Sequence, residues 1–239
     1  RKFFSTLNKR VNQYFKEQNL SKKANTEMVV KSIVFILGYS LPFIALLMYQ
    51  PPFWISLALW AVMGFSLAGI GMSIMHDAIH GAYSNNSKIN YLMSLSLNLV
   101  GGSIINWHWQ HNVLHHTYTN ITHWDEDIDD KGTLKFSPHT KVKWFHKAQW
   151  LYAFFFYGLL TLYWVVGKDF VQFVKYTRNG VNDNSWFKTA IIFFRILLLK
   201  VVYFFVMLVA PTMFFNIPFG QVITGFLLMH FISGIVLTV

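Results

Sequence analysis

The chain has 239 residues, of which 54% are hydrophobic and only 13% are charged. Soluble globular proteins carry about 25% charged residues, so this composition excludes a disordered chain, a collagen-like repeat and an ordinary small soluble enzyme. The charged residues that give the net charge of +10 lie in polar segments, and the apolar runs contain almost no charged residue. This distribution is typical of the cytoplasmic flanks of membrane helices, so we expect a lipid bilayer as partner and no nucleic acid.

Residues 1–27 are polar and basic, and their apolar side chains recur at helical spacing: Phe3, Phe4, Leu7, Val11, Tyr14 and Phe15. The pattern predicts an amphipathic helix on the membrane surface, followed by one membrane domain over residues 28–239. The chain begins with Arg1 rather than Met, and it is still apolar at Val239. We therefore expect it to be truncated at both ends.

The first two predicted spans are residues 29–49 and 53–75, which are apolar and long enough to cross a bilayer. Only Gln50-Pro51-Pro52 separates them, and proline breaks helices, so they should form a helical hairpin. This link carries no Lys or Arg and should face outside. The positive-inside rule then places the N-terminus and the far end of the hairpin in the cytoplasm.

Two further spans are predicted near the end of the chain, over residues 196–215 and from Phe219 onward. An uncharged turn joins them. Arg195 and Lys200 are expected to snorkel to the membrane surface at the inner end of the third span. The four runs together predict an all-α integral membrane protein with four transmembrane helices.

Two other apolar stretches are not assigned as spans by length alone. Residues 91–105 are too few to cross a bilayer and are predicted to form an interfacial or buried helix. Residues 148–167 are uncharged and long enough, and basic residues flank them on both sides. Their pattern alone leaves open whether they cross.

Histidines form two clusters that indicate a metal site. His76 and His80 are four residues apart at the inner end of the second span, and His111 and His115 repeat this spacing. His116 adds a fifth imidazole. Since the chain has no cysteine, a metal must be held by nitrogen or oxygen, and imidazole suits Fe, Zn, Cu and Ni. Five imidazoles exceed the needs of one metal and suggest two, a centre suited to activating O₂.

Several side chains near the clusters are candidates for hydrogen bonds to metal-bound imidazoles. Asp77 follows His76 and either orients a neighbouring imidazole or is a simple helix-end charge. His108 could share the face of His111, or contact a lipid headgroup. Five of the ten acids lie in one run, and Asp125 and Asp127 there are the possible partners of the imidazoles: Asp125, Glu126, Asp127, Asp129 and Asp130. Docking of a cationic protein and a solvated loop are the alternatives for this run.

The motif His-Asp-Ala-Ile-His-Gly-Ala-Tyr over residues 76–83 resembles the first histidine box of membrane fatty acid desaturases. The motif His-Asn-Val-Leu-His-His-Thr-Tyr-Thr-Asn over residues 111–120, followed by an acidic run, resembles the second box. The similarity is to the bacterial linoleoyl-CoA and front-end branch and covers essentially the whole chain.

The resemblance implies four membrane helices under a cytoplasmic, histidine-rich helical cap. It implies that two iron ions bind to His76, His80, His111, His115 and His116. The reaction implied is the insertion of a cis double bond into a fatty acyl chain, with O₂ as co-substrate. The acyl chain would be carried by CoA, acyl carrier protein or phospholipid, and electrons would come from a separate donor such as ferredoxin or a small cytochrome.

The resemblance also implies a third histidine box and a further late-helix histidine beyond Val239, so we expect the 239-residue chain alone to be inactive. Residues 148–167 are then expected to be interfacial or half-inserted, because a crossing would put the third box on the wrong side. His230 is expected to pack or form a hydrogen bond rather than bind metal.

Three alternative functions remain open. A hydroxylase or ketolase of the same superfamily would have a similar site but a product that carries oxygen. An inactive fragment that lacks the third box is the second alternative. A membrane haem protein is the third, but it would need histidines that face one another within the spans, whereas these clusters lie at helix ends.

Overall fold

The computed structural model describes residues 2–129 and 132–239, so Asp130 of the acidic run lies outside the described residues. The described part is helical, with no strand in it. Four of its helices are long and apolar enough to cross a membrane: Thr26–Tyr49, Phe53–Ile79, Trp186–Phe215 and Phe219–Thr238. The predicted all-α fold with four membrane-spanning helices is confirmed.

The first hairpin consists of α2 (Thr26–Tyr49) and a second helix that runs from α3 (Phe53–Gly69) through the π-helical segment η1 (Ile70–Met75) into α4 (His76–Ile79). Asn25 caps α2 by accepting a hydrogen bond from the backbone N–H of Met28. Gln50, with φ of 44°, ends α2 in the left-handed conformation. The hairpin predicted around Pro51-Pro52 is therefore confirmed.

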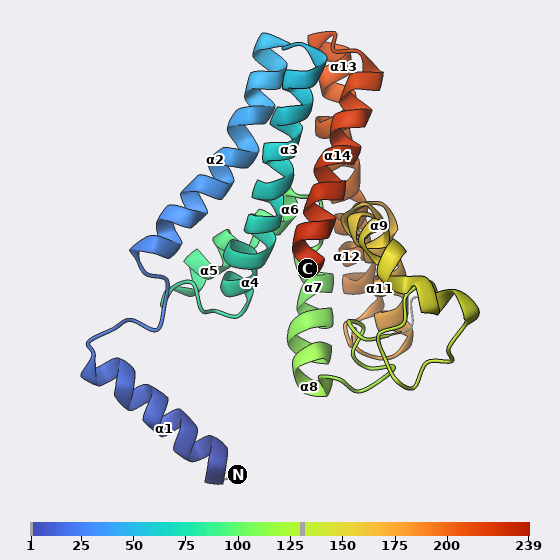
Figure 1. Cartoon of the computed structure of the whole chain (residues 1–239). Coiled ribbons are helices and arrows are strands. Elements are labelled where there is room, and N and C mark those ends of the chain that lie inside the picture. The colour runs from blue at the N-terminus through green and yellow to red at the C-terminus, as the bar shows by residue number, and fades with distance from the viewer. Residues whose placement is uncertain (1, 130–131) are drawn as a thin grey trace.

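The second hairpin consists of α12 (Trp186–Phe204), η5 (Phe205–Val209) and α13 (Ala210–Phe215), followed by α14 (Phe219–Thr238). The turns of both hairpins lie at the same end of the bundle (Figure 1). The side chain of Gln50 joins them by donating a hydrogen bond to the carbonyl of Phe215, at 2.6 Å. The Nε2 of Gln221 adds a second link to Ser56 Oγ, at 2.5 Å.

The helices α3 and α14 pack closely because glycine lets their surfaces approach. A Cβ added at Gly225 would overlap the indole of Trp60, which is only 3% exposed and cannot turn away. Gly220 lies on the same helix, and a Cβ there would meet nothing within 4 Å. Small residues at such contacts are typical of helix pairs within membranes.

We expect Gly225→Ala to lower the free energy of unfolding by about 1–3 kcal/mol, the usual cost of overpacking. Gly220→Ala is the matched control and should be neutral or slightly stabilising, since alanine is the better helix former. Thermal unfolding of the purified protein in detergent, followed by circular dichroism, measures both. Equal unfolding temperatures for the two variants would contradict this account of the helix contact.

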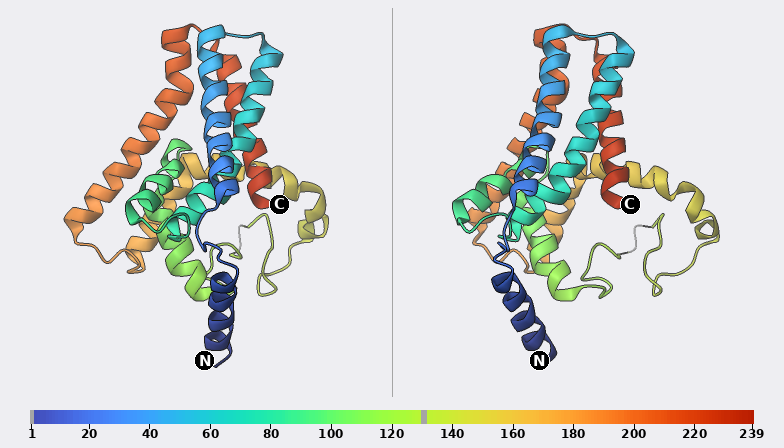
Figure 2. Two further views of the ribbon diagram at one scale, coloured as in Figure 1. Left: turned by 90° about the vertical axis from the view of Figure 1, so that its left-hand side faces the viewer. Right: turned by 60° about the vertical axis from the view of Figure 1, so that its left-hand side comes forward.

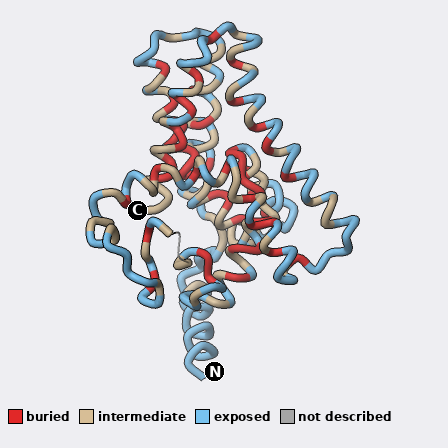
Figure 3. Tube along the Cα trace, turned by 90° about the vertical axis from the view of Figure 1, so that its right-hand side faces the viewer, coloured by how far each residue is buried: buried red, intermediate tan, exposed pale blue. Residues whose placement is uncertain are grey.

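The short helices between the second and third spans form the part that we call the cap, residues 76–178. They surround the ends of the spans opposite the two hairpin turns (Figure 1). Buried segments are concentrated where the spans meet the cap (Figure 3). After α4, the cap contains α5 (Ser87–Ser94), α6 (Ser96–Leu99), α7 (Ile104–Trp107), η2 (His108–His115), α8 (His116–Tyr118), η3 (Trp144–Ala148), α9 (Gln149–Gly158), α10 (Leu160–Tyr163), η4 (Trp164–Lys168) and α11 (Asp169–Arg178).

The two stretches left unassigned by length both lie in the cap. Residues 91–105 are divided among α5, α6 and the start of α7, none of which has the length of a span, as predicted. Residues 148–167 lie in a bent pair of helices, Trp144–Gly158 and Leu160–Arg178, with an angle of 48° between them. A straight crossing is therefore excluded. The pair has the form of a broken span or a re-entrant loop, and its interfacial position stays a prediction.

The prediction for Lys200 is wrong. Its side chain does not snorkel but is 3% exposed, and its Nζ lies 2.6 Å from Asp169 Oδ2. It also donates to the carbonyl oxygens of Gly101, at 2.6 Å, and Trp164, at 3.1 Å. Because α11 brings a counter-charge to the side of α12, the ammonium group is satisfied inside the protein. Arg195, one turn earlier, is exposed.

The N-terminal helix α1 (Lys2–Glu17) has the predicted location, and none of its residues is buried. It extends away from the rest of the protein in both views of Figure 2. The segment after it is tied to the cap, since Lys23 Nζ donates to the carbonyl of Gly81, at 2.7 Å, and Ala24 N donates to Tyr83 O. Contact of α1 with the membrane surface stays a prediction.

Candidate metal centre

The first histidine cluster lies where the second span ends. His76 begins α4, directly after the π-helical segment η1, and His80 is the last residue before the turn at Gly81. One helical turn separates the two rings, whose centroids are 4.7 Å apart. Gly81, with φ of 65°, ends the helix in a conformation that glycine adopts without strain. Both imidazoles are therefore held at the boundary between span and cap.

His111 and His115 of the second cluster lie on η2, and His116 follows directly at the start of α8. The π-helical form of η2 determines which rings meet. In an α-helix, positions five apart are rotated by about 140° from one another. In a π-helix, hydrogen bonds close at i+5, so such positions are neighbours on one face of the helix. His111 and His116 are related in this way, and their Nε2 atoms are 3.3 Å apart. The widened turn therefore adds His116 to the face that carries His111 and His115.

The two clusters converge as the sequence predicts. His111 Nε2 lies 3.1 Å from His76 Nε2, and the ring centroids of His80 and His116 are 4.8 Å apart. Asn112 ties the two boxes together by donating from Nδ2 to the carbonyl of Ile79, at 3.2 Å. The five imidazoles thus form one group at the junction of spans and cap.

Two overlapping sets of side chains in this group can hold a metal ion. The potential ligand atoms of His76, His80 and His111 all lie within 4.8 Å of one another, and those of His111, His115 and Asp127 do so as well. His111 belongs to both sets. The donors are nitrogen-rich and lack sulfur, which suits iron and other borderline metals. This donor set and spacing fit a two-metal centre.

Carboxylates contact the Nδ1 atoms of two of the imidazoles. His115 Nδ1 lies 3.0 Å from Asp125 Oδ1 and 3.2 Å from Asp127 Oδ2. His76 Nδ1 lies 3.3 Å from Asp77 Oδ1. Metal-binding histidines commonly donate their second N–H to a carboxylate, which fixes the ring and leaves Nε2 for the metal. The structure thus brings all three predicted aspartates to the imidazoles, and this role in metal binding stays a proposal.

Asp125 is the most firmly held of these carboxylates. Burial opposes its ionised form, but hydrogen bonds from His115 and from the backbone N–H groups of Asn120 and Asp127 outweigh burial and lower its pKa. Glu126 is also buried, and its Oε1 pairs with Lys175 Nζ at 2.8 Å. The alternative of a solvated loop is therefore wrong for these two acids.

Two of the imidazoles, His111 and His80, have lowered pKa values. Burial, together with the neighbouring rings of His76, His80, His116 and His115, lowers the pKa of His111 to about 3. Burial and the charges of His76 and His116 lower the pKa of His80 as well. Only a neutral imidazole binds a metal ion, and crowding therefore keeps these rings neutral at physiological pH.

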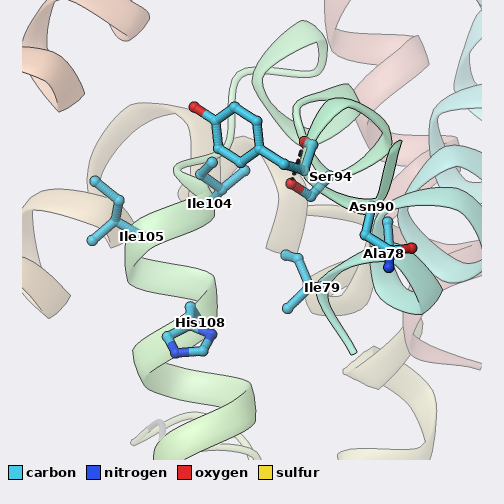
Figure 4. Close-up of a pocket in the computed structure, with 8 residues that line it drawn as sticks. Ala78, Ile79, Asn90, Ser94, Ile104, Ile105 and His108 are labelled. Carbon is cyan, nitrogen blue, oxygen red and sulfur yellow. Dashed lines mark hydrogen bonds between the residues drawn. The ribbon is translucent and has the colours of Figure 1, made fainter. Parts of the chain in front are cut away.

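His108 lies outside this group. It is exposed, and it forms no hydrogen bond with the five histidines in the part of the chain that the structure describes. It lines a groove of about 330 Å³ together with Ile104 and Ile105. These face Ala78, Ile79, Asn90 and Ser94 across the groove (Figure 4). Ala78 and Ile79 lie between the two histidines of the first box, so the groove adjoins the candidate metal centre.

His230 forms hydrogen bonds, as predicted. It is completely buried, its Nε2 lies 2.9 Å from the hydroxyl of Tyr203, and its Nδ1 lies 3.2 Å from Thr161 Oγ1. Sequence reasoning missed Asp169, which is fully buried and accepts hydrogen bonds from the backbone of Ser103 and the indole of Trp164. Its signal is a carboxylate, next to Lys168, in the mostly apolar stretch of residues 159–174.

Comparison with known proteins assigns the chain to a family. Residues 52–238 match the family model described as fatty acid desaturase. The chain is 34% identical to an sn-1 linoleoyl-lipid 6-desaturase of Arthrospira platensis, over 69% of this chain and 45% of the relative. It is 33% identical to an acyl-lipid (8-3)-desaturase of Physcomitrium patens, over 72% of this chain and 36% of the relative.

A longer alignment reaches acyl-lipid (8-3)-desaturase B of Dictyostelium discoideum, which is 26% identical over 97% of this chain and 50% of the relative. The chain thus spans half or less of the length of these curated relatives. No solved structure matches it significantly.

Proposed function

Because this chain belongs to the fatty acid desaturase family, we propose that it inserts a cis double bond into a fatty acyl chain at a centre of two iron ions. The observation that carries the proposal is the convergence of five imidazoles from two boxes, with His111 Nε2 between His76 Nε2 at 3.1 Å and His116 Nε2 at 3.3 Å. The irons would be held by His76, His80, His111, His115 and His116.

The bound irons would supply the activation of O₂. In the overall reaction, two hydrogens leave adjacent methylenes of the acyl chain. O₂ takes these, together with two further electrons and two protons, and becomes two water molecules. The two further electrons require a separate donor such as ferredoxin or a small cytochrome, and we propose that it reaches the centre from the cytoplasm.

The protein's own residues would place the reactants. Asp77, Asp125 and Asp127 orient the imidazoles by accepting their second N–H groups. The groove beside the centre has an apolar part lined by Ala78, Ile79, Ile104 and Ile105, which would suit an acyl chain. Among CoA, acyl carrier protein and phospholipid, the names of the relatives favour an acyl group on a membrane lipid.

Two measurements test the proposal. The protein, expressed from its complete reading frame and purified in detergent, should contain two iron ions per chain by elemental analysis. Membranes of the expressing cells should contain a new unsaturated fatty acid by gas chromatography with mass spectrometry. A hydroxylated or keto product would instead support the hydroxylase or ketolase alternative. A protein that binds no metal would contradict the proposed centre.

A further inference from the structure

Four aromatic rings form one stack that ends at the candidate metal centre. Trp164 lies on Trp107 with a centroid distance of 5.1 Å and an interplanar angle of 21°. Trp107 lies on His111 at 5.0 Å and 20°, and His111 lies on His115 at 5.2 Å and 10°. The stack joins the bent helices of the cap to the helix of the second box.

In the described part of the chain, His80, His111 and His116 have no carboxylate partner, and His111 is the one of these three that belongs to both sets of possible metal ligands. The Nδ1 atoms of His76 and His115 each have a carboxylate partner. Among the described residues, His111 Nδ1 has no hydrogen-bond partner. The ring therefore lacks the usual means by which a metal-binding histidine is oriented. Its plane is instead in contact with two stacked rings, the indole of Trp107 and the imidazole of His115.

A buried carboxylate holds the far end of the stack. Asp169 is completely buried, and its Oδ1 accepts a hydrogen bond from Trp164 Nε1, at 3.2 Å. Its Oδ2 accepts from the backbone N–H of Ser103, at 3.1 Å, and pairs with Lys200 Nζ, at 2.6 Å. Ser103 caps α7, the helix that carries Trp107. One carboxylate thus places both tryptophans relative to each other.

We propose that Trp107, backed by Trp164 and Asp169, is a positioning residue that sets the orientation of the metal-binding imidazole of His111. The proposal rests on the proposed metal centre. An imidazole binds metal only along the direction of its Nε2 lone pair, so tilting the ring weakens binding and distorts the coordination geometry. Stacking holds the ring without using a hydrogen-bonding atom.

Titration of the purified, metal-free protein with Co²⁺ tests this proposal, because the visible absorption band of bound Co²⁺ reports coordination geometry as well as affinity. Trp107→Leu should lower Co²⁺ affinity by about 10–100-fold, the usual effect of losing a group that supports a ligand, and should shift the band. Trp107→Phe keeps an aromatic ring in the stack and should restore both to near the wild-type values.

Trp109→Leu is the matched control. Trp109 lies two residues further along the same helix and is buried, but it packs edge-on against Tyr176, away from the stack. This variant should unfold at a lower temperature while its Co²⁺ affinity and band stay unchanged. A loss of packing alone would therefore be distinguished from a loss of ligand orientation.

The outcomes separate the positioning role from the metal centre itself. If wild-type protein binds no Co²⁺, the metal centre is wrong and the positioning role is lost with it. If wild type binds Co²⁺ and folded Trp107→Leu has the same affinity and band, only the positioning role is overturned. If Trp107→Leu does not fold, Trp164→Leu is measured instead, and its Co²⁺ affinity and absorption band are judged in the same way. This substitution removes the ring that stacks on Trp107, and it leaves the helix of the second box unchanged.

Discussion

Replacing His111 with alanine is expected to abolish iron binding and product formation together. The reason is the central place of its imidazole, which belongs to both sets of ligand atoms and whose Nε2 lies 3.1 Å from that of His76. Removal of any other single histidine takes away a ligand from an edge of the group. Elemental analysis of the purified protein, together with the fatty acid profile of expressing membranes, measures the two effects.

His139→Ala is the matched control for His111→Ala. His139 is exposed and is not among the possible metal ligands that the described residues form. This variant should retain full iron content and activity. If His111→Ala retained the iron content of His139→Ala, the two sets of ligands would not share His111, and the proposed arrangement of the centre would be wrong.

The second large effect is expected at the buried pair of Asp169 and Lys200. Asp169→Asn and Lys200→Met should each lower the free energy of unfolding by about 3–5 kcal/mol, because either change leaves one buried charge without its partner. Lys200 is 3% exposed and its Nζ lies 2.6 Å from Asp169 Oδ2, so water cannot replace the missing group.

The double variant Asp169→Asn/Lys200→Met removes both charges and should be more stable than the sum of the two single losses predicts. Thermal unfolding in detergent gives all three values, and exposed Asp183→Asn serves as the control for loss of one negative charge. Strictly additive losses, or single variants as stable as the control, would show that the two charges do not depend on each other.

The sequence predicts the elements of the fold well because lipid imposes a strict local rule. A helix that crosses a bilayer must be apolar over about 20 residues, and this requirement can be read without knowledge of any contact. Residues 29–49 and 53–75 therefore become spans as expected. The same rule did not decide whether residues 148–167 cross the membrane. Length and composition do not reveal the bend of 48° between Trp144–Gly158 and Leu160–Arg178.

The histidines of the candidate site and the aspartates Asp77, Asp125 and Asp127 beside them were predictable, but the detailed contacts were not. Four-residue spacing places His76 beside His80 on any helix. Nothing local, however, distinguishes Asp125, which lies 3.0 Å from His115 Nδ1, from Asp129, whose Oδ1 accepts from the backbone N–H of His123. The π-helical turn that brings His116 to His111 is also absent from any pattern of residue types.

The membrane character, the four spans and the two histidine boxes can all be predicted from the sequence, because each depends on composition or on spacing within one helix. Three contacts become visible in the folded protein alone: Lys200 pairs with the buried Asp169, Asp169 accepts a hydrogen bond from Ser103, and Trp164 stacks on Trp107. These contacts join residues that are far apart in the chain. They follow from how the helices pack, and the pattern within each helix does not specify its neighbours.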